Sequence, residues 1–232
     1  MAIKRKKNKQ QEETLVDIVE VKDSAQGFLE TNQKNIMGGL LALIVVVGGY
    51  LAFKHLYQGP RETEASTQLS QAQLQFEKDS FALALSNPGS GAPGFLDIID
   101  NHSGTKAANL ATYYSGASYL HLGQYDLAIQ FLEDFNPKGE VLEGPTFSMI
   151  GDAYAEKGDM NNAASYYKKA VNAADGNEFL APMYLKKVGM MAEKNENWKA
   201  AADAYNKIKM EYPTSVDGND IDKYLARVTP KL

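Results

Sequence analysis

The sequence of 232 residues contains no cysteine. It therefore holds no disulfide framework, no thiolate zinc site, no cysteine nucleophile and no cysteine that could carry a bacterial lipid at the N-terminus. Basic residues are in the minority, since 24 Lys and Arg stand against 29 Asp and Glu, and the net charge is −5. This balance argues against a nucleic-acid partner. Hydrophobic residues make up 44% of the chain, which is enough for a folded core.

Motifs that would indicate an enzyme are also lacking. The sequence has no phosphate-binding glycine loop after a strand, no nucleophile elbow and no His–Glu metal motif. Its three histidines, His55, His102 and His121, are dispersed along the chain. The Gly-rich loop Asn87–Gly94 follows no predicted strand, so it does not indicate a nucleotide site. We therefore expect a protein that is not an enzyme, with no catalytic residues, no metal site and no cofactor.

Charge is absent from one long segment, Ile36–Phe53, which reads IMGGLLALIVVVGGYLAF. As a helix rising about 1.5 Å per residue it would extend about 27 Å, close to the hydrocarbon thickness of a bilayer. Tyr50, Lys54, His55 and Tyr57 cluster at its far end, as interfacial anchors do. We predict a transmembrane helix over residues 36–53. The alternatives are a buried core helix, for which no other stretch of the chain supplies apolar surroundings, and a cleaved signal peptide, which is normally shorter.

Residues 1–35 form the predicted tail before the span, with basic side chains clustered between Lys4 and Lys9. Basic residues favour the cytoplasmic side, so we expect a cytoplasmic N-terminus with residues 54–232 outside the cytoplasm. A short amphipathic helix is predicted within this tail. Inside the span, small residues are spaced four apart at Gly38 and Ala42 and at Gly48 and Ala52, which predicts packing against another membrane helix. The alternative is the ordinary frequency of glycine in membrane helices.

A self-similar pattern occurs three times after residue 108, beginning at Gly116, Gly151 and Gly189. The leading glycine lets the second helix of a hairpin lie close on the first, and a glycine seven residues later forms the turn between the two helices. The third copy has Glu196 at this turn position, which leaves its turn geometry open.

This pattern resembles the tetratricopeptide repeat, with the best match at Thr146–Val171. We predict an all-α protein in which a single N-terminal transmembrane helix is followed by a tetratricopeptide-repeat-like α-solenoid. The predicted units within 54–232 are a degenerate unit at about 62–104, repeats at about 109–136, 144–174 and 182–213, and a capping helix at about 219–228.

Stacked helical hairpins curve, and the first helix of each hairpin lines the concave side. Helical phase predicts eight partner-binding residues on that side: Tyr113, Ala117, Leu120, Asp152, Ala155, Met183, Lys186 and Met190. A surface that mixes apolar side chains with adaptable Met suits loose binding of varied extended polypeptides. The alternative is that several of these residues belong to the core between repeats. Recognition of a C-terminal carboxylate by paired Lys and Asn residues is not expected, because Lys186 lacks the Asn partners.

The segment Val19–Gln58 is similar to the corresponding region of YfgM-type proteins, in which an acidic stretch, a Lys, an aromatic residue, an Asn and a Gly-rich span follow one another. The matching residues here are Lys22, Phe28, Asn32, Gly38 and Gly39, and the turn at Ser103–Ala108 is similar as well. The basic terminus Lys4–Lys9 and the loop Asn87–Gly94 are additions to the family's pattern.

The resemblance implies an ancillary, chaperone-like subunit of the bacterial SecYEG translocon, located in the inner membrane with a periplasmic C-terminal domain. The partners that it implies are the SecYEG-type translocon and a membrane-anchored prolyl-isomerase-like chaperone, besides the lipid bilayer and extended polypeptide clients. The alternative function is a membrane-tethered tetratricopeptide scaffold for another cell-envelope complex.

Overall fold

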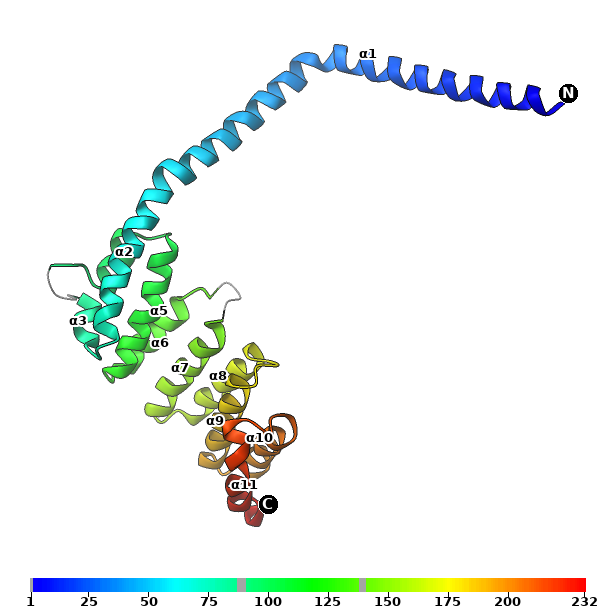
Figure 1. Cartoon of the computed structure of the whole chain (residues 1–232). Coiled ribbons are helices and arrows are strands. Elements are labelled where there is room, and N and C mark those ends of the chain that lie inside the picture. Colours follow the sequence, from blue (N-terminus) through cyan, green and yellow to red (C-terminus); the bar gives the residue numbers. More distant parts are fainter. Residues whose placement is uncertain (1, 87–90, 138–140) are drawn as a thin grey trace. The chain divides into compact units, whose positions relative to one another are not determined.

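The computed structural model describes residues 2–86, 91–137 and 141–232, with side chains from residue 27 onward (Figure 1). Helices account for all of the regular secondary structure in these residues, and no strand occurs among them. The chain divides into two compact units, Met1–Gly59 and Pro60–Leu232. The predicted loop Asn87–Gly94 lies partly outside the described residues, as do the side chains of the basic cluster Lys4–Lys9.

The first unit is a long helix, α1 (Ala2–Ala52), followed by a π-helical turn, η1 (Phe53–Gln58). The apolar side chains predicted to cross a membrane are exposed except for the half-buried Ile36, and Val46 is 68% exposed. A window of this helix is long and apolar enough to span a bilayer, and no residue of the window is buried, so the alternative of a buried core helix is wrong. The backbone of the tail continues directly into the apolar segment, instead of forming a separate short helix.

In the second unit, consecutive helices pack against one another as a series of helical hairpins (Figure 1). Its helices are α2 (Gly59–Phe76), α3 (Phe81–Ser86), α4 (Phe95–Asn101), α5 (Lys106–His121), α6 (Tyr125–Asp134), α7 (Glu143–Glu156), α8 (Met160–Ala173), α9 (Leu180–Lys194), α10 (Trp198–Glu211) and α11 (Val216–Val228), followed by the short turn η2 (Thr229–Lys231). The pairs α5–α6, α7–α8 and α9–α10 form three hairpins, and each packs on the next. The predicted α-solenoid is confirmed.

The leading glycine of each repeat lies where the two helices of the hairpin touch. A Cβ atom added at these positions would lie 2.6 Å from Leu132 Cγ at Gly116, 2.7 Å from Tyr167 Cδ1 at Gly151 and 2.2 Å from Tyr205 Cε1 at Gly189. These distances are too short for any side chain, so only glycine permits the observed helix approach.

The turns between the paired helices take a left-handed backbone conformation. Gly123 has φ 72° and Gly158 has φ 80°, as expected for glycine. Glu196, at the same place in the third repeat, also has a positive φ of 55°. The third turn therefore keeps the geometry of the other two, at the cost of strain in a residue that carries a Cβ.

The degenerate unit differs from the sequence prediction in one respect. The sequence predicted a degenerate unit at about 62–104 without placing a break inside it, whereas in the structure α2 ends at Phe76 and α3 begins only at Phe81. The break lies at Asp79, whose φ is 55°. The carboxylate of Glu62 accepts hydrogen bonds from the first two backbone N–H groups of α5, at 2.8 and 3.0 Å, and so joins α2 to the first repeat.

Candidate protein-binding groove

A cavity of about 460 Å³ lies between α7 and α9, with part of α8 at its base. We call it the α7–α9 groove. Its lining residues are Asp152, Ala155, Glu156, Tyr167, Met183, Lys186, Lys187, Met190 and Met191. The α9 members Met183, Lys187 and Met190 are three or four residues apart, which brings their side chains to one face of the helix.

Five of the eight predicted partner-binding residues line this groove, namely Asp152, Ala155, Met183, Lys186 and Met190. Sequence reasoning missed Lys187, although its position four residues after Met183 places it on the same helix face. It also missed Tyr167, which lies on α8, the second helix of this hairpin. Tyr167 reaches the groove because its ring crosses over Gly151.

The other three predicted residues lie on α5, outside the groove. Ala117 is 3% exposed, so the prediction that it contacts a partner is wrong; small size places it in the interior between helices. Tyr113 and Leu120 are half-buried and pack against the cluster of Ala128, Ile129 and Leu132 from the second helix of the same hairpin. Burial, with a smaller contribution from Tyr114, raises the pKa of Tyr113 above its ordinary value.

The groove has a polar base in which Asp152 is the central acceptor. Lys187 Nζ lies 2.6 and 2.8 Å from the two carboxylate oxygens of Asp152 and 3.1 Å from Ser148 Oγ. The hydroxyl of Tyr167 donates to the same carboxylate at 2.6 Å. Burial, together with this bond to Asp152, raises the pKa of Tyr167, so its hydroxyl keeps its proton at neutral pH.

Lys186, the second lysine of the groove, forms its ion pair with a different helix. Lys186 Nζ forms an ion pair with Asp217 on α11, and both side chains are largely shielded from solvent. Consecutive lysines on α9 thus connect this helix to α7 on one side and to α11 on the other. The positive charges of both lysines are thus balanced by carboxylates of the same chain.

The apolar part of the groove consists of methionines. Met190 is 40% exposed, Met183 is half-buried and Met191 is 9% exposed. The exposure of these side chains therefore decreases from the mouth of the groove to the core. Methionine is flexible and polarizable, and it adapts to side chains of different shape. The groove is therefore suited to hold apolar side chains of a polypeptide without strict selection among them.

Among the residues that the structure describes, no group of three His, Asp or Glu side chains could hold a metal ion. The stacked hairpins and the α7–α9 groove define a helical-repeat scaffold of the kind that serves protein–protein interaction. Residues 110–136 and residues 145–177 each match the family described as tetratricopeptide repeat. These two matches support tetratricopeptide repeats in this part of the second unit, and proteins built from such repeats are generally scaffolds without enzymatic activity. No curated protein matches the chain.

Proposed function

We propose that the chain is a single-pass membrane protein whose α-solenoid binds polypeptide partners beside the bilayer. One observation carries this proposal: in the helix that precedes the repeats, no residue of an apolar window long enough to cross a membrane is buried. Apolar surface of this extent is stable only in contact with lipid or with another protein. The basic cluster at the start of the chain supports a cytoplasmic N-terminus, and the repeats then lie on the opposite side.

The finer proposal is an ancillary, chaperone-like subunit of the bacterial protein translocon, in the inner membrane with its repeats in the periplasm. It is supported by the resemblance of Val19–Gln58 to YfgM-type proteins. On this proposal the partners are a SecYEG-type translocon, a membrane-anchored prolyl-isomerase-like chaperone and extended clients. A membrane anchor raises the effective concentration of the repeats at the exit of a channel, so even weak contacts lead to capture.

The α7–α9 groove suits such clients. Its volume of about 460 Å³ accommodates a few side chains, and its exposed wall is apolar and adaptable. A protein that holds many different emerging chains and then releases them needs contacts that are weak and unselective.

The membrane helix suits a partner in the bilayer. A Cβ atom added at Gly38 or Gly48 would meet no atom within 4 Å, and Ala42 and Ala52 are exposed. These four small residues therefore leave room for the close approach of a second membrane helix.

Site-specific photocrosslinking in native membranes tests both parts of the proposal. A photoreactive residue is placed at Met190 in the groove or at Gly48 in the membrane helix, and at Leu83 on α3 as an exposed control position. Adducts are identified by mass spectrometry. We expect translocon subunits from Gly48, emerging chains or the partner chaperone from Met190, and neither from Leu83.

Two outcomes would count against the finer proposal. Adducts that contain no translocon subunit at either position would refute the proposal of a translocon subunit. Adducts that consistently contain one other envelope complex would support the alternative of a tethered scaffold for that complex.

A further inference from the structure

Three of the most exposed large side chains occur at the beginnings of successive first helices. Val141, just before α7, is 83% exposed; Phe179, the N-cap of α9, is 81% exposed; and Val216, the first residue of α11, is 78% exposed. They are spaced at the repeat period, 38 and 37 residues apart. We call these three residues the apolar edge.

Contacts between α7 and α9 show that these helices run in the same direction. Near their beginnings, a Cβ atom added at Gly144 would lie 3.2 Å from the Tyr184 ring. About two turns further along α7, Asp152 meets Lys187 of α9. Because the contacts advance along both helices together, the N-terminal ends of α7 and α9 lie at the same side of the solenoid.

The same relation holds for α9 and α11. Lys186 pairs with Asp217 near the beginning of α11, and Glu193 binds Arg227 near its end, with 2.6 Å between Oε1 and Nη2. The N-terminal ends of all three helices therefore follow one another along one side of the second unit, and the apolar edge is a row.

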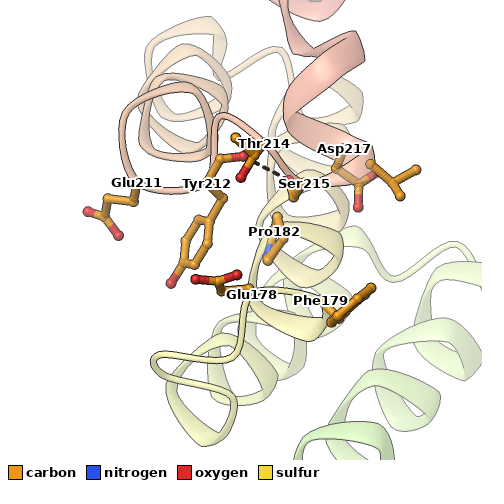
Figure 2. Close-up of a pocket in the computed structure, with 9 residues that line it drawn as sticks. Glu178, Phe179, Pro182, Glu211, Tyr212, Thr214, Ser215 and Asp217 are labelled. Atoms are coloured by element: carbon orange, nitrogen blue, oxygen red, sulfur yellow. Dashed lines mark hydrogen bonds between the residues drawn. The ribbon is translucent and has the colours of Figure 1, made fainter.

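A pocket of about 170 Å³ opens on this row between α9 and α11 (Figure 2). Phe179 and Val216 belong to its lining, together with Pro182 and Tyr212. In Figure 2, Tyr212 and Glu178 lie close together at one end of the pocket, and Phe179 extends away from them. The row thus combines an exposed aromatic ring with an adjacent depression that could receive an apolar side chain.

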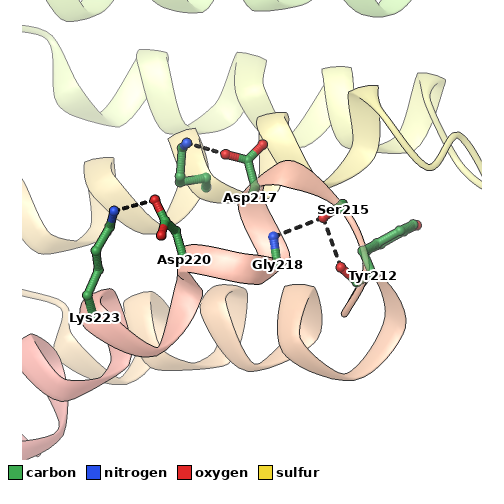
Figure 3. A network of polar contacts seen from close by, with 7 residues as sticks. Tyr212, Ser215, Asp217, Gly218, Asp220 and Lys223 are labelled. Carbon is green, nitrogen blue, oxygen red and sulfur yellow. Dashed lines mark hydrogen bonds and ion pairs between the residues drawn. The ribbon is translucent and has the colours of Figure 1, made fainter.

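The charges around the pocket have one sign. Its charged lining residues are Glu178, Glu211 and Asp217, with no Lys or Arg. Asp217 is neutralised by Lys186, and the Ser215 hydroxyl caps the same turn by accepting from Gly218 N–H at 2.9 Å (Figure 3).

The other two carboxylates leave the pocket negative. Within the described residues, Glu211 pairs only with Lys207 of its own helix, at 3.8 Å, and Glu178 has no ion-pair partner. The rim of the pocket is therefore a negative surface open to solvent, complementary to a positively charged partner.

We propose that the apolar edge binds an extended, basic polypeptide segment with an apolar side chain at every third residue. Packed helices lie about 8–10 Å apart, and an extended chain advances about 3.3 Å per residue, so one step along the row corresponds to about three residues. Lys or Arg between the apolar residues would face Glu178 and Glu211. The apolar edge begins at α7 and does not extend to α5, because α5 starts with the polar residues Thr105 and Lys106.

The test uses the full chain in nanodiscs of neutral phosphatidylcholine, which do not attract basic peptides. Fluorescence anisotropy measures binding of a labelled peptide with three Leu-Lys-Ser units and of a matched peptide with three Leu-Glu-Ser units. We expect the basic peptide to bind and the acidic one not to bind. Phe179→Ser and Val216→Ser, which alter exposed side chains only, should each weaken binding by about fivefold or more.

Two control variants separate this surface from others on the chain. Leu83→Ser removes an exposed apolar side chain on α3, and Met190→Ala alters the α7–α9 groove; both should leave the affinity unchanged. Equal binding by wild type, Phe179→Ser and Val216→Ser would overturn the proposal, as would absence of binding. Loss of binding in Met190→Ala alone would place the peptide in the groove instead. A dimer by light scattering that Phe179→Ser dissolves, without peptide binding, would show that the edge joins two copies.

Discussion

The contact between Gly189 and Tyr205 makes the repeat packing sensitive to a single methyl group. In Gly189→Ala the new Cβ would lie 2.2 Å from Tyr205 Cε1, and the three nearest atoms all belong to this ring. Tyr205 is 0% exposed, and its hydroxyl donates to Glu193 Oε1 at 2.5 Å. The ring is therefore held by packing on its sides and by a hydrogen bond at its tip, and it has no free space to enter.

Two opposing contributions decide the effect of this substitution. Alanine is favoured over glycine in a helix interior by about 1 kcal/mol. Overpacking of a close-packed core costs about 1–3 kcal/mol, and the fixed ring places this site at the upper end of that range. We expect the free energy of unfolding to fall by about 2 kcal/mol in Gly189→Ala, in spite of the better helix propensity.

Urea denaturation of the full chain in detergent, followed by the fluorescence of Trp198, measures the change. Trp198 is the single tryptophan of the chain and begins α10, the second helix of the same hairpin. Equal or higher stability of Gly189→Ala would refute the reasoning.

A double-mutant cycle supplies the control. With Tyr205→Ala as background, the methyl group no longer meets the ring, and Gly189→Ala should become stabilising by about 1 kcal/mol. If the substitution destabilises this background as well, a contact other than Tyr205 limits the helix approach.

Three further predictions concern the turn, the α2 attachment and alkaline pH. Glu196→Gly should raise the free energy of unfolding by about 1 kcal/mol in the Trp198 assay, because glycine adopts the positive φ of this turn without strain; lower stability would contradict this reading. Glu62→Ala should lower stability by about 1 kcal/mol, because two N–H groups at the start of α5 lose their acceptor, whereas Glu64→Ala on the exposed side of α2 should have little effect. Burial raises the pKa of Tyr184 from 10.0 to about 12, so the unfolded chain loses this proton first and stability should fall as the pH rises from 10 to 12. Urea denaturation across this range should show a shallower decline in Tyr184→Phe, and an identical decline would exclude Tyr184 as its source.

Local sequence rules were sufficient for most of the elements. Repeated glycines, small crossing residues and turn positions depend on contacts within one hairpin, so their spacing is visible along the chain. The break between α2 and α3 was not predicted. The residue with the left-handed conformation at this break is Asp79, and no glycine is present there to indicate a turn. The cap that Glu62 places on α5 could not be predicted either, since donor and acceptor are more than forty residues apart.

The candidate groove was predicted in part, for a related reason. Helical phase identifies which residues share a face, and Asp152, Met183 and Met190, which it grouped, line the α7–α9 groove. It does not reveal whether a neighbouring helix covers that face. Ala117 shares the phase of an exposed position but is covered, and Lys186 is engaged by α11, which follows two helices later.

The sequence by itself determined the all-helical class, the repeat period and the uncharged segment long enough for a membrane, because each depends on local spacing or composition. Only the tertiary structure decided which side chains remain exposed after the hairpins stack. It buries Ala117, opens the α7–α9 groove and lines up Val141, Phe179 and Val216. The physical reason is that exposure depends on packing between segments one repeat or more apart, and the spacing of residues along the chain does not reveal which helix covers which face.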